Sequence, residues 1–187
     1  MTDPIYFTGR CLLALPGMGD PRFEQAVIAI CMHDENGAMG IDLGRTVDGV
    51  HAAEVFVQLG LESAQDMGEQ PLFQGGPVEM ERGFVLHSLD YSRGDTVDVA
   101  GRWGLTSSLT ILADIAAGNG PVRWRLALGY SGWDAGQLEE ELTRHGWLIA
   151  DCDKEVLFAA PPEELWQAAY RSAGIDPAML SSGFGAA

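Results

Sequence analysis

Short apolar runs separated by turn residues open the chain and predict strands. Cys11–Leu15 and Ala26–Met32 are rich in branched residues and bounded by turn signals, which is typical of buried strands. The segment Pro16–Phe23 between them is rich in proline and glycine and predicts a loop. Asn36-Gly37 follows the second run. It predicts a hairpin, because both central residues of a type I′ turn need a positive φ.

The middle of the chain combines helical and alternating patterns. His51–Leu59 carries apolar residues at i, i+3, i+4 and i+7, and Ser108–Ala117 is apolar nearly all round. Both segments therefore predict helices, the second one deeply packed. Four further segments predict strands, among them one in which valines alternate with Asp98. These strands are Pro71–Gly75, Gly83–Ser88, Thr96–Trp103 and Val122–Leu128.

The last third of the chain predicts two more helices and two short strands. Ala135–His145 follows a capping residue, Asp134, and a second helix runs from Pro161 to the stop signal at Gly174. Trp147–Asp151 and Val156–Ala159 read as short strands. An early hairpin followed by helical crossovers favours a mixed β-sheet covered by helices, of class α/β or α+β.

Length and composition bound the kind of protein. A chain of 187 residues supports one hydrophobic core, so we expect a single domain over about residues 7–180 and a flexible tail at 181–187. No leader pattern or membrane-length apolar run is visible, which predicts a cytoplasmic protein without membrane contact. Cys11, Cys31 and Cys152 form no CxxC pair. We therefore expect reduced, buried thiols, with neither a metal nor another cofactor.

The charge balance argues against direct binding to nucleic acid. The chain has 11 basic and 27 acidic residues and a net charge of −16. Binding to DNA or RNA depends on neutralising phosphates with Lys and Arg, and the arginines here are scattered along the sequence. A protein partner or a small metabolite is the expected ligand.

A glycine-rich stretch, Gly129–Gly136, lies between a predicted strand and a predicted helix, where phosphate-binding loops occur. It matches neither dinucleotide nor P-loop motifs, and glutamates fill the start of the next helix. Ser131 could be a nucleophile, but Trp133 stands where a nucleophile elbow needs glycine. A structural loop is the favoured reading.

Two histidines and nearby charges offer a catalytic alternative. His33 and His87 end predicted strands, and with Glu79 they could form an acid/base or metal cluster of a small hydrolase. No metal-ligand spacing such as HxxxH supports the cluster, and hydrogen-bonded structural histidines are the plainer reading. Glu79 and Glu81 could instead form surface ion pairs with Arg82.

Several blocks of sequence, in order, resemble the bacterial YqgE/AlgH family over about residues 7–180. The blocks are Leu12–Phe23, Gly37–Gly40, Gly75–Glu79 with Arg82–His87, Ala127–Trp133 with Gly136–Leu142, and Trp166–Leu180. The resemblance implies a compact one-domain α/β fold. Members are often labelled transcriptional regulators, and the family supplies no catalytic residue or cofactor to carry over.

One block departs from the family pattern. After Gly40 the family usually has Leu/Ile-Val-Ile-Asn-Lys/Arg-Pro, whereas this chain has Ile41-Asp-Leu-Gly-Arg-Thr46. Asp42 replaces an apolar residue, Gly44 and Thr46 replace the Asn and Pro, and Arg45 persists. The family also often has alanine at the position of Ser131. Alanine cannot act as a nucleophile, so a catalytic role for Ser131 is disfavoured.

These observations leave three hypotheses. The first is a non-enzymatic binding or regulatory protein whose surface combines three loops, Pro16–Phe23, Gly75–Arg82 and Tyr130–Trp133. The residues expected on that surface are Asp20, Arg22, Phe23, Arg82, Tyr130 and Trp133. Asp20-Pro21 could alternatively serve only as a turn. The second hypothesis is a hydrolase using His33, His87 and Glu79. The third is a nucleic-acid-binding regulator, which requires a folded arginine face.

Overall fold

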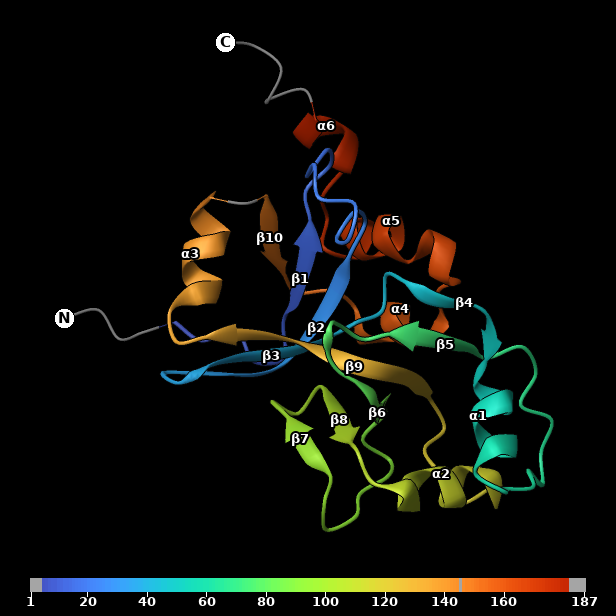
Figure 1. Ribbon diagram of the computed structural model, residues 1–187. Helices are drawn as coiled ribbons and strands as arrows, with labels where there is room; N and C mark the ends of the chain where they lie inside the picture. Colours follow the sequence, from blue (N-terminus) through green and yellow to red (C-terminus); the bar gives the residue numbers. More distant parts are fainter. Residues whose placement is uncertain (1–4, 145, 182–187) are drawn as a thin grey trace.

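A curled β-sheet runs through the computed structural model, which describes residues 5–144 and 146–181 (Figure 1). Its main path is β10-β1-β2-β3-β9-β6-β8-β7, and β5 joins β9 while β4 joins β5. Every pair is antiparallel except β5–β9, which is parallel. The described strands are β1 (Cys11–Ala14), β2 (Val27–Asp34), β3 (Gly37–Asp42), β4 (Thr46–His51), β5 (Pro71–Gln74), β6 (Val78–His87), β7 (Val97–Val99), β8 (Trp103–Thr106), β9 (Trp124–Asp134) and β10 (Trp147–Ala150).

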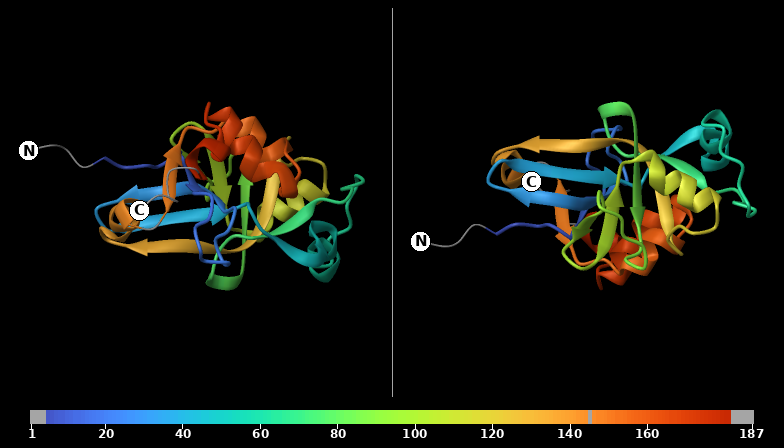
Figure 2. Two further views of the ribbon diagram at one scale, coloured as in Figure 1. Left: turned by 90° about the horizontal axis from the view of Figure 1, so that it is seen from above. Right: turned by 90° about the horizontal axis from the view of Figure 1, so that it is seen from below.

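Helices cover the sheet in three groups, each over its own part of the core. The described helices are α1 (Ala52–Gln58), α2 (Leu109–Ala116), α3 (Gln137–Arg144), α4 (Lys154–Ala159), α5 (Pro162–Ser172) and α6 (Pro177–Ser181). Apolar residues of α4 and α5 pack with β1, β2, β6 and β8. Those of α1 and α2 pack with β5, β6 and β9. Leu138 of α3 packs with β1, β2 and β10. Figures 1 and 2 show α3 at the opposite end of the molecule from α1 and α2. The predicted class, a mixed sheet covered by helices, is confirmed.

Strand β9 is the centre of this arrangement, because β3, β5 and β6 all pair with it. The connection from β5 to β6 must therefore pass over β9 to reach its other side. Glycines make this close crossing possible. The Gly75 N–H donates to the Leu128 carbonyl at 2.9 Å, and a Cβ on Gly129 would lie 2.5 Å from the Gly76 oxygen. Gly129 also has a φ of +73°, which favours glycine.

Most predicted elements are present, with shifts of a few residues at their ends. The strands predicted at Cys11–Leu15 and Ala26–Met32, the helix over His51–Leu59 and the helix ending at Gly174 correspond to β1, β2, α1 and α5. The hairpin after β2 is confirmed. Its two-residue turn is Glu35–Asn36 rather than Asn36–Gly37, because Asp34 pairs with Gly37 and its side chain accepts the Asn36 N–H at 2.7 Å.

Three predicted elements are wrong in type or extent. Val156–Ala159 belongs to helix α4 rather than to a strand, because Asp153 caps the helix by accepting the Glu155 N–H at 2.9 Å. Thr96–Trp103 is divided between β7 and β8 by a turn in which Ala100 and Gly101 have positive φ. The predicted Tyr130–Trp133 loop is the second half of β9.

Other features were not anticipated. The sequence patterns did not predict β4 or α6, and β6 begins five residues before the predicted strand. The predicted tail, residues 181–187, lies outside the described residues except for Ser181 at the end of α6. Within the part of the chain that the structure describes, no helix is long and apolar enough to cross a membrane.

Candidate functional site

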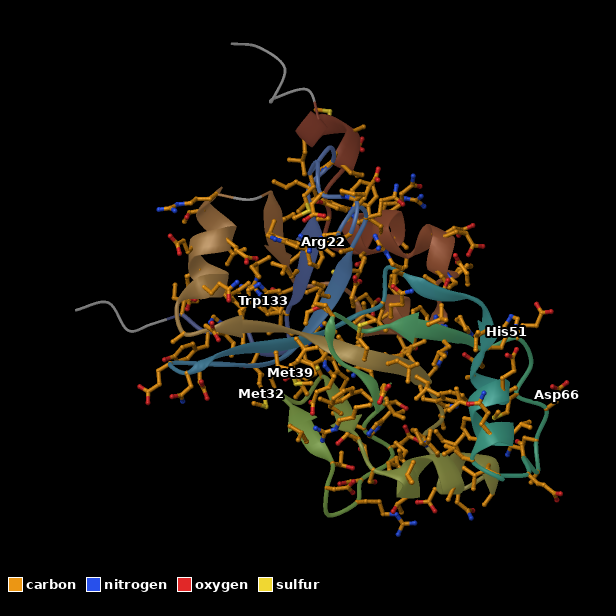
Figure 3. All side chains as sticks on the ribbon, viewed as in Figure 1. Arg22, Met32, Met39, His51, Asp66 and Trp133 are labelled. Carbon is orange, nitrogen blue, oxygen red and sulfur yellow. The ribbon has the colours of Figure 1, made fainter. Side chains whose placement is uncertain are left out.

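A groove of about 640 Å³ opens between the loop that joins β1 to β2, the end of β9, and α3. We call it the Asp20 groove. Figure 3 labels Arg22 and Trp133, which both line it. Segments far apart in sequence meet here, including Pro77 from the connection over β9. The residues relevant to its chemistry are Met18, Asp20, Arg22, Phe23, Pro77, Ser131, Trp133, Gln137, Glu141, Arg144 and Trp147.

The loop on one side of the groove is fixed by its own hydrogen bonds. Asp20 accepts the Arg22 main-chain N–H at 3.0 Å and both ends of its guanidinium, with Nη2–Oδ2 at 2.8 Å. This pairing with Arg22 holds the pKa of Asp20 below its usual value. The Arg45 guanidinium donates to the carbonyl of Pro21. The Asp-Pro turn is present, and the same loop lines the groove.

Aromatic rings and one carboxylate complete the lining of the groove. Phe23 meets Trp147 edge to face, with ring centroids 5.6 Å apart. The indole Nε1–H of Trp133 donates to Glu141 Oε2 at 2.9 Å, and Gln137 Nε2 donates to Oε1 of the same carboxylate at 3.0 Å. Because both carboxylate oxygens are engaged, Glu141 is held in place by Trp133 and α3 rather than free to rotate.

Arg82 and Tyr130 do not line the Asp20 groove. They line a second hollow that also borders Trp133. Successive side chains of a strand point to opposite faces of the sheet, so Tyr130 and Ser131 face different hollows. Arg82 pairs with Glu79 at 3.3 Å and lies 5.1 Å from the centre of the Phe84 ring. The predicted single surface is therefore divided: Asp20, Arg22, Phe23 and Trp133 converge, whereas Arg82 and Tyr130 do not join them.

Ser131 shows no arrangement for nucleophilic catalysis. The residue is buried on β9, and its Oγ donates to the Gly75 carbonyl at 3.3 Å. None of the described histidines hydrogen-bonds to it. Its hydroxyl fastens the connection that crosses β9, which is a structural role.

Both ring nitrogens of His33 are held by hydrogen bonds to neighbouring segments. The Phe7 N–H donates to Nδ1 at 3.0 Å, so Nδ1 carries no proton and Nε2–H donates to Glu139 Oε1 at 3.0 Å. The imidazole is 1% exposed and stacks on the Phe7 ring. These contacts join the N-terminal segment and α3 to β2.

His87 is buried in a separate network. Its Nδ1–H donates to the Ser88 carbonyl at 2.9 Å, so Nε2 accepts from the Thr106 hydroxyl at 2.9 Å. Burial lowers the pKa of this imidazole, because the charged form loses its hydration. The result is a neutral histidine inside the protein.

The strand registers keep the two histidines apart. His33 lies opposite Ala38, which lies opposite Trp133 of β9, whereas His87 lies opposite Trp124. From Trp124 to Trp133 is nine residues, or roughly 30 Å along the strand at about 3.3 Å per residue. Glu79 is exposed and paired with Arg82. The His33/His87/Glu79 cluster is therefore not formed, and no group of three or more metal-ligand side chains occurs among the described residues.

Among the residues that the structure describes, the arginines do not form a basic face. Six of them, Arg10, Arg22, Arg82, Arg93, Arg123 and Arg144, are ion-paired with carboxylates. Arg125 is buried and donates to the carbonyls of Leu157 and Ala160. Because phosphate binding needs available cations, this distribution gives the nucleic-acid hypothesis no support.

The departure from the family pattern has a structural explanation. Asp42 is buried and accepts the N–H groups of Val27 and Gly44 at 3.2 and 2.8 Å, which ties the end of β3 to the start of β2. Burial raises the pKa of Asp42 to about 7. Gly44 lies so close to the backbone that a Cβ there would be 2.6 Å from the Gln25 oxygen. Arg45 then supports the groove loop through Pro21.

Sequence reasoning missed several groove residues. Met18, Trp147 and the α3 side chains Gln137 and Glu141 were not among the candidates. The spacing of Gln137 and Glu141, i and i+4 on one helix, was a signal that they share a face. Trp147 gave no such signal, because its place in the groove depends on the β1–β10 pairing.

Comparison with known proteins identifies the relatives of this chain. A family model described as AlgH-like matches residues 11–178. A UPF0301 protein of Sphingopyxis alaskensis is 50% identical over 181 residues, covering 97% of this chain and 96% of that protein. One from Rhizorhabdus wittichii is 48% identical over the full length of both.

Solved structures support the fold. The solution structure of AlgH from Pseudomonas aeruginosa is 39% identical, with a TM-score of 0.76 over 100% of this chain and 99% of that one. A Corynebacterium diphtheriae protein with 22% identity shares the fold with a TM-score of 0.76, covering 97% and 94% of the two chains. The chain therefore belongs to the AlgH-like family.

Proposed function

We propose that this protein is a non-enzymatic binding protein of the cytoplasm and that the Asp20 groove receives its ligand. The observation that carries the proposal is convergence: the β1–β2 loop, the end of β9 and α3 meet around one aromatic hollow. Its volume lies in the range of about 300–1,000 Å³ typical of ligand sites. An effect on transcription would then be indirect, through the bound ligand, because six of the described arginines are ion-paired with carboxylates.

The lining of the groove indicates the chemistry of the ligand. Phe23, Trp133 and Trp147 offer apolar and aromatic surface, while Asp20 and Glu141 place carboxylates at its border. These side chains suit a compact, largely apolar group with a hydrogen-bond donor at one end. A small metabolite or a side chain projecting from a partner protein could supply such a group.

Thermal shift measurements test the small-molecule form of the proposal. A ligand at about 100 times its Kd stabilises by roughly 2.7 kcal/mol, which for this length raises Tm by about 5–10 °C. The panel contains metabolites, nucleotides and divalent metals. We expect a hit to stabilise the wild type and a Val57→Ala control, since Val57 is an exposed residue of α1, but not Phe23→Ala. A shift that persists in Phe23→Ala contradicts a ligand in this groove.

Site-specific photocrosslinking tests the protein-partner form. A benzophenone amino acid replaces Met18 in the groove or Val57 on α1, and crosslinking is carried out in cells. Partner capture at position 18 well above that at position 57 supports the proposal. Equal capture at both positions, together with no thermal shift from the panel, contradicts it.

A further inference from the structure

The second hollow is an open groove on the face of the sheet opposite the Asp20 groove. It has a volume of about 640 Å³ and lies between the β2–β3 hairpin and the strands β6, β7 and β8. Met32 and Met39 lie directly opposite each other in the β2–β3 ladder and both line it. Figure 3 shows these two side chains side by side on the hairpin. We call it the methionine groove.

The groove exposes apolar surface that the fold does not use. Met32 is 50% exposed and Val97 across the groove is 42% exposed, while Met39 and Tyr130 are half-buried. Exposed apolar side chains that gather in one hollow indicate an interaction site, whereas single exposed apolar side chains are common on protein surfaces. Methionine suits such a site, because its flexible, polarizable side chain adapts to different partners.

The border of this groove is acidic. Asp34, Glu79 and Asp134 line it, and Glu35 and Glu81 are exposed beside it. The only cationic side chain among the lining residues, Arg82, is already held by Glu79, by Ser107 at 3.0 Å and by the Phe84 ring. A partner with positive charges around an apolar centre complements both the apolar surface of the groove and its acidic rim.

We propose that the methionine groove binds a basic amphipathic helix of a partner protein, with apolar side chains on Met32 and Met39 and Lys or Arg beside the acidic rim. The pairing of the strands favours a helix over an added strand. At the centre of the groove, Met39 of β3 pairs with Met32 of β2 on one side and with Gly132 of β9 on the other, so β3 cannot pair with an added strand here. The proposal does not depend on the Asp20 groove having a ligand.

Fluorescence anisotropy with labelled model peptides tests the partner's chemistry. Three 18-residue peptides share leucines at helical spacing and carry Lys, Gln or Glu at the other positions. A fourth has the Leu/Lys composition scrambled, so that it lacks an apolar face. We expect the patterned Lys peptide to bind about tenfold more tightly than the Gln and scrambled peptides, and the Glu peptide not to bind.

Matched variants locate the binding site. Met32→Gln removes exposed apolar surface from the groove, and Leu109→Gln does the same on distant α2, where Leu109 is also exposed. Asp34→Asn removes a rim charge, and Asp66→Asn removes one elsewhere. In both aspartates, Oδ1 accepts the main-chain N–H of the residue two positions later. The side-chain oxygen of asparagine can accept the same hydrogen bond. We expect each groove variant to weaken binding about five- to tenfold and each control by less than about twofold. Thermal melting checks that all four variants fold.

Each other outcome overturns the proposal. Equal binding of the scrambled peptide, or equal weakening in the controls, shows attraction to net charge alone. Absence of binding by the patterned Lys peptide excludes the proposed partner class. Sedimentation velocity without peptide tests whether a second copy of this chain occupies the groove. Self-association that Met32→Gln abolishes would assign the groove to that second copy.

Discussion

Replacing Gly129 with alanine is expected to destabilise the protein severely, because this residue lies where the β5–β6 connection crosses β9. The added Cβ would lie 2.5 Å from the Gly76 oxygen, 2.9 Å from the Val78 oxygen and 3.2 Å from the Met80 Cα. All three atoms belong to the main chain, so no change of rotamer can relieve the contacts. The φ of +73° adds a second cost.

The two costs can be estimated separately. A left-handed backbone conformation costs a residue with a Cβ about 1–2 kcal/mol. Forcing extra volume into a packed region costs about 1–3 kcal/mol more. We therefore expect Gly129→Ala to lower the free energy of unfolding by about 2–5 kcal/mol, which is a large part of the roughly 5–15 kcal/mol available to a domain.

A matched control isolates the crossing itself. Gly174 has a φ of +76°, and a Cβ there would meet nothing within 4 Å. Gly174→Ala should therefore cost only the conformational part, about 1–2 kcal/mol. Urea unfolding followed by circular dichroism measures both variants. Equal destabilisation of the two would refute the reasoning, because it would show that contact with the crossing connection has no energetic weight.

Three further predictions concern buried polar groups. The pKa of about 7 for Asp42 exceeds the roughly 3.9 of an unfolded aspartate, so stability should fall as pH rises from about 4 to 7. Asp42→Asn should remove that fall. Urea unfolding at pH 5 and pH 8 measures the change in stability between the two pH values, and the same change in wild type and variant would contradict the prediction. The lowered pKa of His87 means that stability is fully present above about pH 6.5 and is lost as pH falls and the unfolded imidazole takes up a proton; an NMR titration midpoint at or above 6.5 would contradict it. Arg125→Met should destabilise by roughly 2–5 kcal/mol, because one buried and one part-buried carbonyl group lose their donor; a loss below about 1 kcal/mol in urea unfolding would count against this.

Local patterns predicted the elements whose signals are local. The helix over Ala52–Gln58 has one apolar stripe, and β1 and β2 are short buried runs between turn residues. The strand predicted at Val156–Ala159 failed because four apolar residues fit either type, and the cap at Asp153 decided for a helix. Glycines in Gly129–Gly132 suggested a loop, whereas they allow another segment to cross a strand. That requirement is tertiary and leaves no local signal.

The candidate site was predicted only in part, because its assembly also depends on tertiary arrangement. Asp20, Arg22, Phe23 and Trp133 converge because β9 ends beside the β1–β2 loop. Tyr130 was grouped with them as a neighbour in a loop, but in a strand adjacent residues face opposite sides. A meeting of the two histidines as strand ends was the alternative to separate structural histidines, and only the registers along β9 show their separation.

The central position of β9 also constrains how the chain can fold. β5 and β6 are synthesised before β9, yet each ends up paired with β9, on opposite sides of it. Their own connection lies across the place that β9 will occupy. The two strands must therefore stay apart, with unpaired edges, until β9 arrives between them. Such late, non-local insertion slows folding and exposes strand edges to aggregation. On the ribosome, this part of the sheet cannot close before residues 124–130 of β9, which pair with β5 and β6, have emerged.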